Sequence, residues 1–361
     1  MSDEPVDPYS AAANAGTLLD HVATAERAGH RRLRAAADIF HLSDDARIDD
    51  RTAAMLDGAM RATIGAVTGG VRDHAARLLL SRGEPALAQA VRGAGDPFGR
   101  LHRAGLFRDP ALFGELFARV RLATIARALP VGLHDGPERP TMLARLAQAG
   151  DRLVAAAAVA LLTADARRVA GDGVDLPRPL HARVAWWVAA ALREEALIAA
   201  GDRIAAVDAA LTDAVRRSFD PQGEVVPVEV AAMRLAHAID AQPGELPPLI
   251  EEAIGDGRLI LFVAMTARAA GLGFDRMRDL VIDTDGARLW VVLRSLGLGR
   301  TTVARIGFAL AEAEPARDVE RFADDLDAIM ALDPAAARTA LSPMTLDPDY
   351  HAALLALGAL R

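Results

Sequence analysis

Apolar residues recur at helical spacing along almost the whole chain, and this pattern limits the possible fold more than any other feature. One such stripe follows Asp109-Pro110 and runs over Leu112, Phe113, Leu116, Phe117 and Val120. Residues spaced in this way share one face of a helix and predict an amphipathic segment. Apolar residues make up 52% of the chain but aromatic residues only 4%, so the stripes consist mostly of Ala, Leu and Val. Because Ala and Leu are strong helix formers, we predict an all-α fold.

Asp-Pro pairs mark the expected starts of helices. They begin at Asp96, Asp109, Asp220, Asp333 and Asp347. An aspartate suits the N-cap because its carboxylate accepts hydrogen bonds from backbone N–H groups that have no partner inside the helix. Proline suits the first helical position because its missing N–H costs nothing there.

Two further patterns predict tight turns between helices. Gly-Asp-Arg at residues 150–152 and 201–203 lets the glycine end one helix in a left-handed conformation while the aspartate caps the next. A local duplication places Arg-Leu, an apolar helix and Gly-Leu-Gly at residues 258–273 and again at 288–299. Near-repeats of this kind are typical of helical solenoids.

We therefore predict an irregular α-solenoid of HEAT-like helical hairpins, in one array or in two lobes. A single hairpin is too small to bury its own apolar stripe, so stacking against neighbours has to supply the core. The proline- and glycine-rich stretch at residues 171–179 is the best lobe boundary. We expect a disordered tail at 1–9, an N-terminal helical lobe at 10–170 and a C-terminal helical-repeat lobe at 178–361.

Composition excludes several kinds of chemistry. The chain has no cysteine and no lysine, which rules out thiolate metal sites, cysteine nucleophiles and lysine-dependent phosphate loops or Schiff bases. Its 41 basic and 49 acidic residues give a net charge of −8, which makes nucleic acid an unlikely partner. The N-terminus does not resemble a signal peptide and no apolar run is long enough to span a membrane. We expect a cytoplasmic protein without a cofactor or a bound metal.

Several segments resemble a bacterial family of uncharacterised proteins. Residues 30–64 carry the clearest likeness, with an arginine-rich start that runs into Ala-Ala-Ala-Asp-Ile-Phe, a Ser-Asp-Asp helix cap and a long Ala/Leu/Arg helix. Residues 77–83, 101–107 and 289–310 look similar too. The chain thus resembles the domain-of-unknown-function family twenty-three thirty-six (DUF2336). The resemblance implies an all-helical, HEAT-like architecture and a regulatory or interaction role, and it supplies no catalytic motif.

Two groups of residues are candidates for contact with a partner. Arg27, Arg31 and Arg34 share one helix face and form the densest basic patch, which suits an anion or an acidic partner but also suits a solvated face. Trp186 and Trp187 lie in an apolar helix, and adjacent residues on a helix point in different directions. One of the two rings should therefore reach a neighbouring helix or a groove, and an exposed ring would be an interface hot spot.

Two alternative functions stay open at this stage. Residues 293–306 have the order of a helix-turn-helix, with Arg300 and Arg305 on the second helix, although that helix is otherwise too apolar to read base edges. Histidine–carboxylate pairs could contribute to a hydrolase or a metal enzyme. These pairs are Asp38 with His41, His237 with Asp240, and Asp347 with His351. Because no third ligand and no nucleophile motif accompany them, we expect a non-catalytic protein-interaction or regulatory scaffold with a protein or peptide partner.

Overall fold

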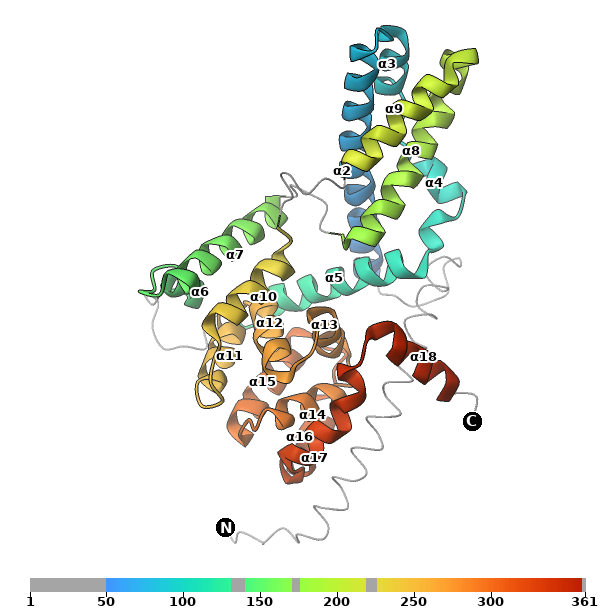
Figure 1. Ribbon diagram of the computed structural model, residues 1–361. Coiled ribbons are helices and arrows are strands. Elements are labelled where there is room, and N and C mark those ends of the chain that lie inside the picture. The colour runs from blue at the N-terminus through green and yellow to red at the C-terminus, as the bar shows by residue number, and fades with distance from the viewer. Residues whose placement is uncertain (1–49, 131–139, 171–175, 219–225, 359–361) are drawn as a thin grey trace, which may run out of the picture. The chain divides into compact units, whose positions relative to one another are not determined.

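The computed structural model describes residues 50–130, 140–170, 176–218 and 226–358. Within these ranges every regular element is a helix and no strand occurs (Figure 1). The prediction of an all-α fold is therefore confirmed. None of the helices in this part of the chain has a stretch long and apolar enough to cross a bilayer. The tail expected at residues 1–9 lies outside the described ranges.

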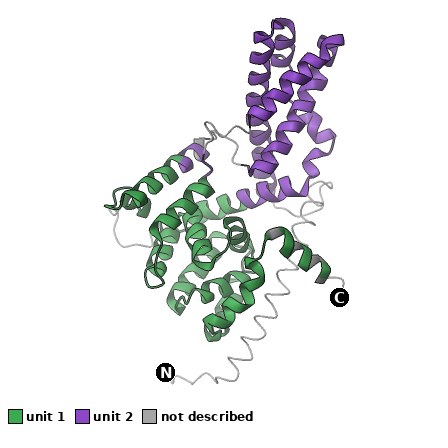
Figure 2. Cartoon of the chain, in the orientation of Figure 1, with its two compact units in different colours: residues 1–33, 121–163, 228–361 green, residues 34–120, 164–227 purple. Residues whose placement is uncertain are grey.

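The helices group into two compact units (Figure 2). Among the described residues, unit 1 draws on 121–130, 140–163 and 228–358, and unit 2 on 50–120, 164–170, 176–218 and 226–227. The division falls inside two helices, α5 (Pro110–Ala128) and α7 (Arg152–Ala170). Each unit therefore combines segments that are distant in sequence.

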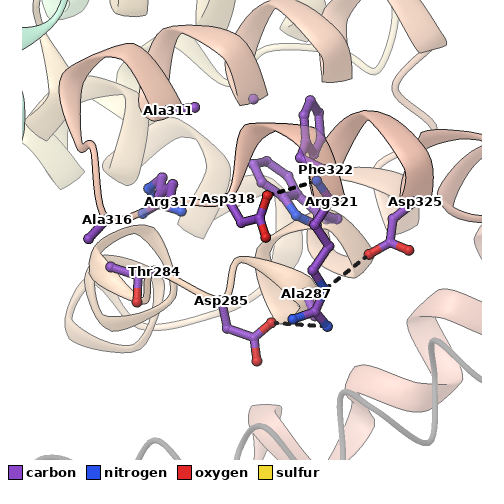
Figure 3. A pocket seen from close by; sticks show the side chains of 12 residues that line it. Thr284, Asp285, Ala287, Ala311, Ala316, Arg317, Asp318, Arg321, Phe322 and Asp325 are labelled. Atoms are coloured by element: carbon purple, nitrogen blue, oxygen red, sulfur yellow. Dashed lines mark hydrogen bonds and ion pairs between the residues drawn. The ribbon is translucent and has the colours of Figure 1, made fainter.

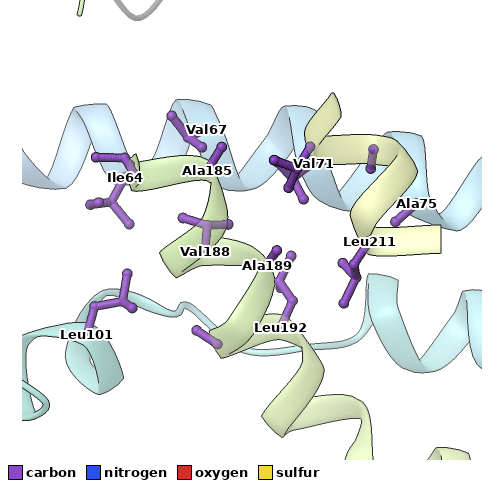
Figure 4. Close-up of a cluster of buried hydrophobic side chains, with 14 of the residues drawn as sticks. Ile64, Val67, Val71, Ala75, Leu101, Ala185, Val188, Ala189, Leu192 and Leu211 are labelled. Atoms are coloured by element: carbon purple, nitrogen blue, oxygen red, sulfur yellow. The ribbon is translucent and has the colours of Figure 1, made fainter. Parts of the chain in front are cut away.

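Unit 2 is built around one long helix. Its elements are α2 (Asp50–Ser81), α3 (Pro85–Arg92), α4 (Phe98–Arg103), η1 (Leu106–Arg108), α8 (Arg178–Ala200), η2 (Gly201–Arg203) and α9 (Ile204–Arg217). Ile64 and Val71 on α2 pack with Val188 and Leu192 on α8 and with Leu211 on α9 (Figure 4). Full burial of each such side chain contributes about 1.5–3 kcal/mol.

Unit 2 contains helices from both sides of residues 171–179, where we expected the boundary between two lobes. A proline- and glycine-rich stretch indicates a break between helices, but it does not indicate which helices pack together. Here α8 and α9, which follow the break, cover the apolar face of α2, which precedes it. The partner of a helix face depends on contacts between residues far apart in sequence, which the local pattern does not encode.

The Asp-Pro pairs start helices as expected. Asp109 Oδ1 accepts a hydrogen bond from the backbone N–H of Leu112 at 2.9 Å, at the start of α5. Asp333 Oδ2 accepts two, each at 3.0 Å, at the start of α17. Asp347 accepts backbone N–H groups in the same way. The Asp96-Pro97 pair is shifted by one residue: Asp96 Oδ1 accepts from Phe98 N, but Pro97 is the N-cap of α4. Asp220 lies outside the described residues.

The two Gly-Asp-Arg turns each follow only half of the expected pattern. Asp151 caps α7, with its Oδ1 accepting from Leu153 N at 2.8 Å, but Gly150 does not have a positive φ. Gly201 ends α8 with a φ of 53°, whereas Asp202 lies within η2 and α9 takes Arg203 as its N-cap. The inserted 3-10 turn moves the second helix start beyond the aspartate.

Unit 1 contains most of the shorter helices. Its elements outside α5 and α7 are α6 (Met142–Leu146), α10 (Val228–Ile239), α11 (Leu246–Gly255), α12 (Leu259–Ala270), α13 (Phe274–Ile282), α14 (Ala287–Ser295), α15 (Arg300–Ala313), α16 (Val319–Ala331), α17 (Pro334–Leu341), η3 (Ser342–Thr345) and α18 (Pro348–Gly358). The short α6 is tied to α11 by a two-pronged ion pair between Arg145 and Glu252, with N–O distances of 2.5 and 2.7 Å. This pair raises the pKa of Arg145.

The duplicated Gly-Leu-Gly sequence forms the same turn twice in unit 1. Gly271 and Gly297 have φ values of 67° and 76°, in the left-handed region that favours glycine. The second glycine of each copy, Gly273 or Gly299, is the extended N-cap of the next helix. The sequence duplication is therefore also a structural duplication of a helix–turn–helix corner.

Candidate functional site

A cavity of about 220 Å³ lies in unit 1 and is the candidate functional site (Figure 3). It is bordered by residues 284–290 around the start of α14, by α15, and by residues 316–325 around the start of α16. Aromatic rings line part of it and charged side chains line much of the rest. Such a lining suits a small ligand with both polar and apolar parts.

Two buried aromatic rings form the apolar wall of the cavity. The centroids of Trp290 and Phe322 are 4.6 Å apart, and Phe308, half exposed on α15, meets Phe322 edge to face at 5.6 Å. Close approach of the backbone makes this packing possible. A Cβ on Gly307 would lie 2.1 Å from Phe322 Cζ, and one on Gly286 would lie 2.9 Å from the Trp290 ring. Only glycine fits at these two positions without moving a ring.

Arg317 is the most unusual charged group at the cavity. Its side chain is only 7% exposed, and one Nη donates to the backbone carbonyl of Val281. Its Nε and its other Nη are buried without a hydrogen-bond partner among the described residues. Burial lowers the pKa of Arg317 to about 10, against the opposing attraction of Glu314 and Asp283. The guanidinium still carries its charge at neutral pH.

The carboxylates nearest Arg317 are engaged by other arginines. Glu314 forms an ion pair with Arg121 at 2.7 Å, and Asp283 forms one with Arg288 at 2.8 Å. All four of these side chains are largely buried. The side chain of Asp285 is buried to the same degree, at 9% exposed, so three guanidinium groups and three carboxylates occupy this layer.

Further charged side chains line the cavity beside this layer. Asp285, Asp318 and Asp325 line it together with Arg321. The half-exposed guanidinium of Arg321 lies 3.9 Å from Asp285 Oδ1 and 3.6 Å from Asp325 Oδ2 (Figure 3). Arg321 and Asp325 are about half exposed, so an ion pair of this length between them contributes little, whereas the Asp285 carboxylate is only 9% exposed.

The family model described as an uncharacterised protein conserved in bacteria (DUF2336) matches residues 171–342. This part of the chain belongs to the DUF2336 family. The resemblance noted in the sequence is confirmed here, and residues 289–310 fall inside the match while residues 30–64, 77–83 and 101–107 precede it. The segments of the cavity between 284 and 325 lie within the DUF2336 region. No curated protein and no solved structure matches the chain.

The residues predicted to contact a partner are not at this cavity. Trp186, on the helix that opens the DUF2336 region, is 44% exposed, whereas Trp187 packs against the core of unit 2. The two rings thus point in different directions. The basic patch of Arg27, Arg31 and Arg34 lies outside the described residues. A role for any of these side chains in partner binding stays a prediction.

The two histidine–carboxylate pairs within the described ranges do not come together in one site. His237 Nδ1 lies 2.7 Å from the carbonyl of Met233, and Asp240 pairs with Arg268 at 3.1 Å. Asp347 caps α18, and His351 is buried. In the described ranges, no group of three or more histidine or acidic side chains is placed to hold a metal ion. The pair of Asp38 and His41 lies outside those ranges.

Residues 293–306, which have the order of a helix-turn-helix, pack within unit 1. Val303 and Ile306 on α15 are buried. Arg300 forms an ion pair with Asp327, and Arg305 forms one with Glu251 at 2.6 Å. Both arginines are thus directed at acidic side chains of the same unit.

Neither Arg317 nor the rings beside it stand out in the amino-acid sequence. Arg317 lies in an acidic, proline-containing turn between α15 and α16, which reads as a solvated linker. The one local signal is Gly307, in the middle of an apolar helix. A glycine that is not needed to end the helix indicates close packing at that position. Its meaning depends on the position of Phe322, which lies 15 residues further along the chain.

Proposed function

We propose that this chain is a non-catalytic binding protein that presents the outer face of α15 and α16 to a protein or peptide partner. The observation that supports this most is Phe308, which is 47% exposed and stacks edge to face on the buried Phe322. A partly exposed aromatic ring anchored on a rigid wall is the kind of side chain that supplies most of the energy of an interface.

The charge of the same face indicates the chemistry of the partner. Glu312, on the same helix as Phe308, and Glu320 and Asp324, on the helix of Phe322, are all exposed. Opposite charges steer association and select partners. The partner should therefore carry an apolar anchor flanked by arginine or lysine. DNA, the alternative drawn from residues 293–306, is disfavoured because these carboxylates repel phosphates.

We further propose that the helices form an irregular, HEAT-like repeat array. The pair of equivalent Gly-Leu-Gly corners at 271–273 and 297–299 supports this architecture. Arrays of stacked hairpins provide extended binding faces, which suits a scaffold. A cytoplasmic location and the lack of catalytic activity stay predictions from the sequence.

The test is peptide selection followed by quantitative binding. The full chain is used to select from a displayed random peptide library, and enriched peptides are measured by calorimetry against the wild type, Phe308→Ala and the control Tyr350→Ala, which also removes an exposed aromatic ring. We expect enriched peptides with an apolar residue between basic residues, affinity that falls with salt, and a loss of about tenfold or more for Phe308→Ala alone. Failure to enrich any peptide, or equal binding to all three proteins, would refute the proposal.

A further inference from the structure

The two units carry opposite net charges. The described residues of unit 2 include 18 arginines and 13 aspartates or glutamates, whereas those of unit 1 include 16 arginines and 21 aspartates or glutamates. Opposite charges on two surfaces steer association and fix how the surfaces meet. The question is therefore whether each unit gathers its surplus charge on an exposed patch.

In unit 2, positive charge gathers on the C-terminal parts of α2 and α9. Arg77 Nη2 lies 3.4 Å from His74 Nδ1, and burial together with the charges of Arg217 and Arg77 lowers the pKa of this histidine. Both guanidinium groups therefore lie close to one ring. Asp213 is the carboxylate that opposes them, but Arg82 holds it in an ion pair at 2.6 Å.

The arginines of this region are available to a partner. Arg77, Arg216 and Arg217 are exposed, and none of the three has an ion pair in the part of the chain that the structure describes. The exposed carboxylate of Asp73 does not offset all three charges. We call the exposed side chains of Arg77, Leu80, Arg216 and Arg217 the α2–α9 patch.

Leu80 gives the α2–α9 patch an apolar centre. Its side chain is 43% exposed and follows Arg77 by three residues, so the two share a helix face. Arg77 and Arg82 flank it in the sequence. An apolar side chain between arginines is the chemistry proposed above for the partner of Phe308.

Trp186 is also exposed on unit 2, but its surroundings are less suitable for an acidic partner. The arginines three residues before it and seven residues after it are already paired, Arg183 with Asp109 at 2.6 Å and Arg193 with Asp208 at 2.8 Å. The α2–α9 patch is therefore the better match for the acidic unit.

In unit 1, the outer face of α15 and α16 is acidic. Glu312 is one turn from Phe308, and Glu320 and Asp324 are one turn apart on α16. All three carboxylates are exposed and have no ion pair among the described residues. Val319, 41% exposed, adds a second apolar side chain to this face.

We propose that the partner of this face is a second copy of the chain, which docks through its α2–α9 patch. Leu80 of one copy lies against Phe308 of the next, and Arg77 and Arg217 face Glu312 and Glu320. Because the two surfaces belong to different units, the contact is head to tail and leaves one of each surface free on the outer copies. The inference rests on the proposed function, since it identifies the protein that the Phe308 face binds.

The first experiment is sedimentation velocity of the full chain over a wide range of protein concentration, at low and at high salt. We expect a sedimentation coefficient that rises with concentration at low salt. Salt should reverse the rise, because it screens attraction between exposed charges. A single monomeric species under all conditions would overturn the proposal, even if the two surfaces met within one copy.

The second experiment exchanges the charges of the two surfaces. One variant carries Arg77→Glu with Arg217→Glu, and the other carries Glu312→Arg with Glu320→Arg. Each alone should associate about tenfold more weakly or worse, because like charges then meet. A mixture of the two variants should associate again, because both of its possible contacts pair opposite charges.

The matched control is Arg103→Glu with Arg108→Glu, which reverses two exposed arginines of unit 2 outside the α2–α9 patch. This control should associate as the wild type does. An equal loss in the control, or no recovery in the mixture of the two variants, would overturn the proposal. A chain that stays monomeric but binds selected peptides through Phe308 would refute the second copy as partner and leave the proposed function standing.

Discussion

Replacing Arg317 with methionine should leave the ligand-free protein as stable as the wild type or more stable, although this side chain is among the most buried polar groups of unit 1. Removal of a buried residue normally costs stability. Here the side chain carries a charge that the described protein does not pair, so its removal relieves a penalty. Methionine is unbranched and adaptable, and it can occupy most of the same path through the core.

The magnitude follows from the two contacts that change. Burial lowers the pKa of Arg317 to about 10, and at about 1.4 kcal/mol per tenfold change in proton affinity this fall corresponds to about 3 kcal/mol against the charged form. The substitution also leaves the carbonyl of Val281 without this donor, which costs about 1–3 kcal/mol. The difference predicts a free energy of unfolding that is unchanged or up to about 2 kcal/mol higher.

The assay is urea unfolding of the full chain at pH 7 without added ligand, with far-UV circular dichroism and tryptophan fluorescence as probes. Arg294→Met is the matched control, because its guanidinium is hydrogen-bonded to the carbonyl of Leu332 and its loss should destabilise by about 1–2 kcal/mol. If Arg317→Met loses more than about 2 kcal/mol, the size of a charged hydrogen bond, the reasoning fails because the guanidinium must then have a partner.

Three further predictions concern packing and titration. Gly307→Ala should destabilise unit 1 by about 1–3 kcal/mol in urea unfolding, because its Cβ would overlap the Phe322 ring; an unchanged midpoint would contradict the packing described. Arg145→Met should cost about 1–3 kcal/mol because it removes the ion pair of the largely buried Glu252, and Arg145→Met with Glu252→Gln should recover part of it. Burial and nearby arginines lower the pKa of His74 below 6.5, so the unfolded chain takes up this proton first as the pH falls. The melting temperature should therefore drop as the pH falls through 6.5, and less so in His74→Gln.

Sequence alone predicted the features that depend on neighbouring residues. The Asp-Pro starts at Asp109 and Asp333 formed as expected, and the duplicated Gly-Leu-Gly sequence gives a left-handed turn at both Gly271 and Gly297. Capping and left-handed turns are decided by a few consecutive residues, so their signal is complete in the sequence. At Gly201, however, the inserted 3-10 turn η2 moves the N-cap of α9 from Asp202 to Arg203.

The candidate site could not be predicted in the same way. The acidic turn around Arg317 has the composition of a solvated linker, and its burial depends on α13, α14 and α16 closing around it. The grouping of the helices was also not predictable, because the apolar stripe of α2 is equally able to pack against any complementary stripe. The burial of Arg317 and the grouping of the helices both depend on contacts between segments far apart in the sequence. The local spacing of apolar residues does not indicate these contacts.

The discontinuous make-up of each unit has a practical consequence for expression. A fragment trimmed to the family match, residues 171–342, would keep α8 and α9 but lose α2, and would keep Glu252 but lose Arg145. Val188, Leu192 and Leu211 would then face solvent, and such a fragment should be poorly soluble. Cloning limits for this protein are better chosen from its packing than from the extent of the family match.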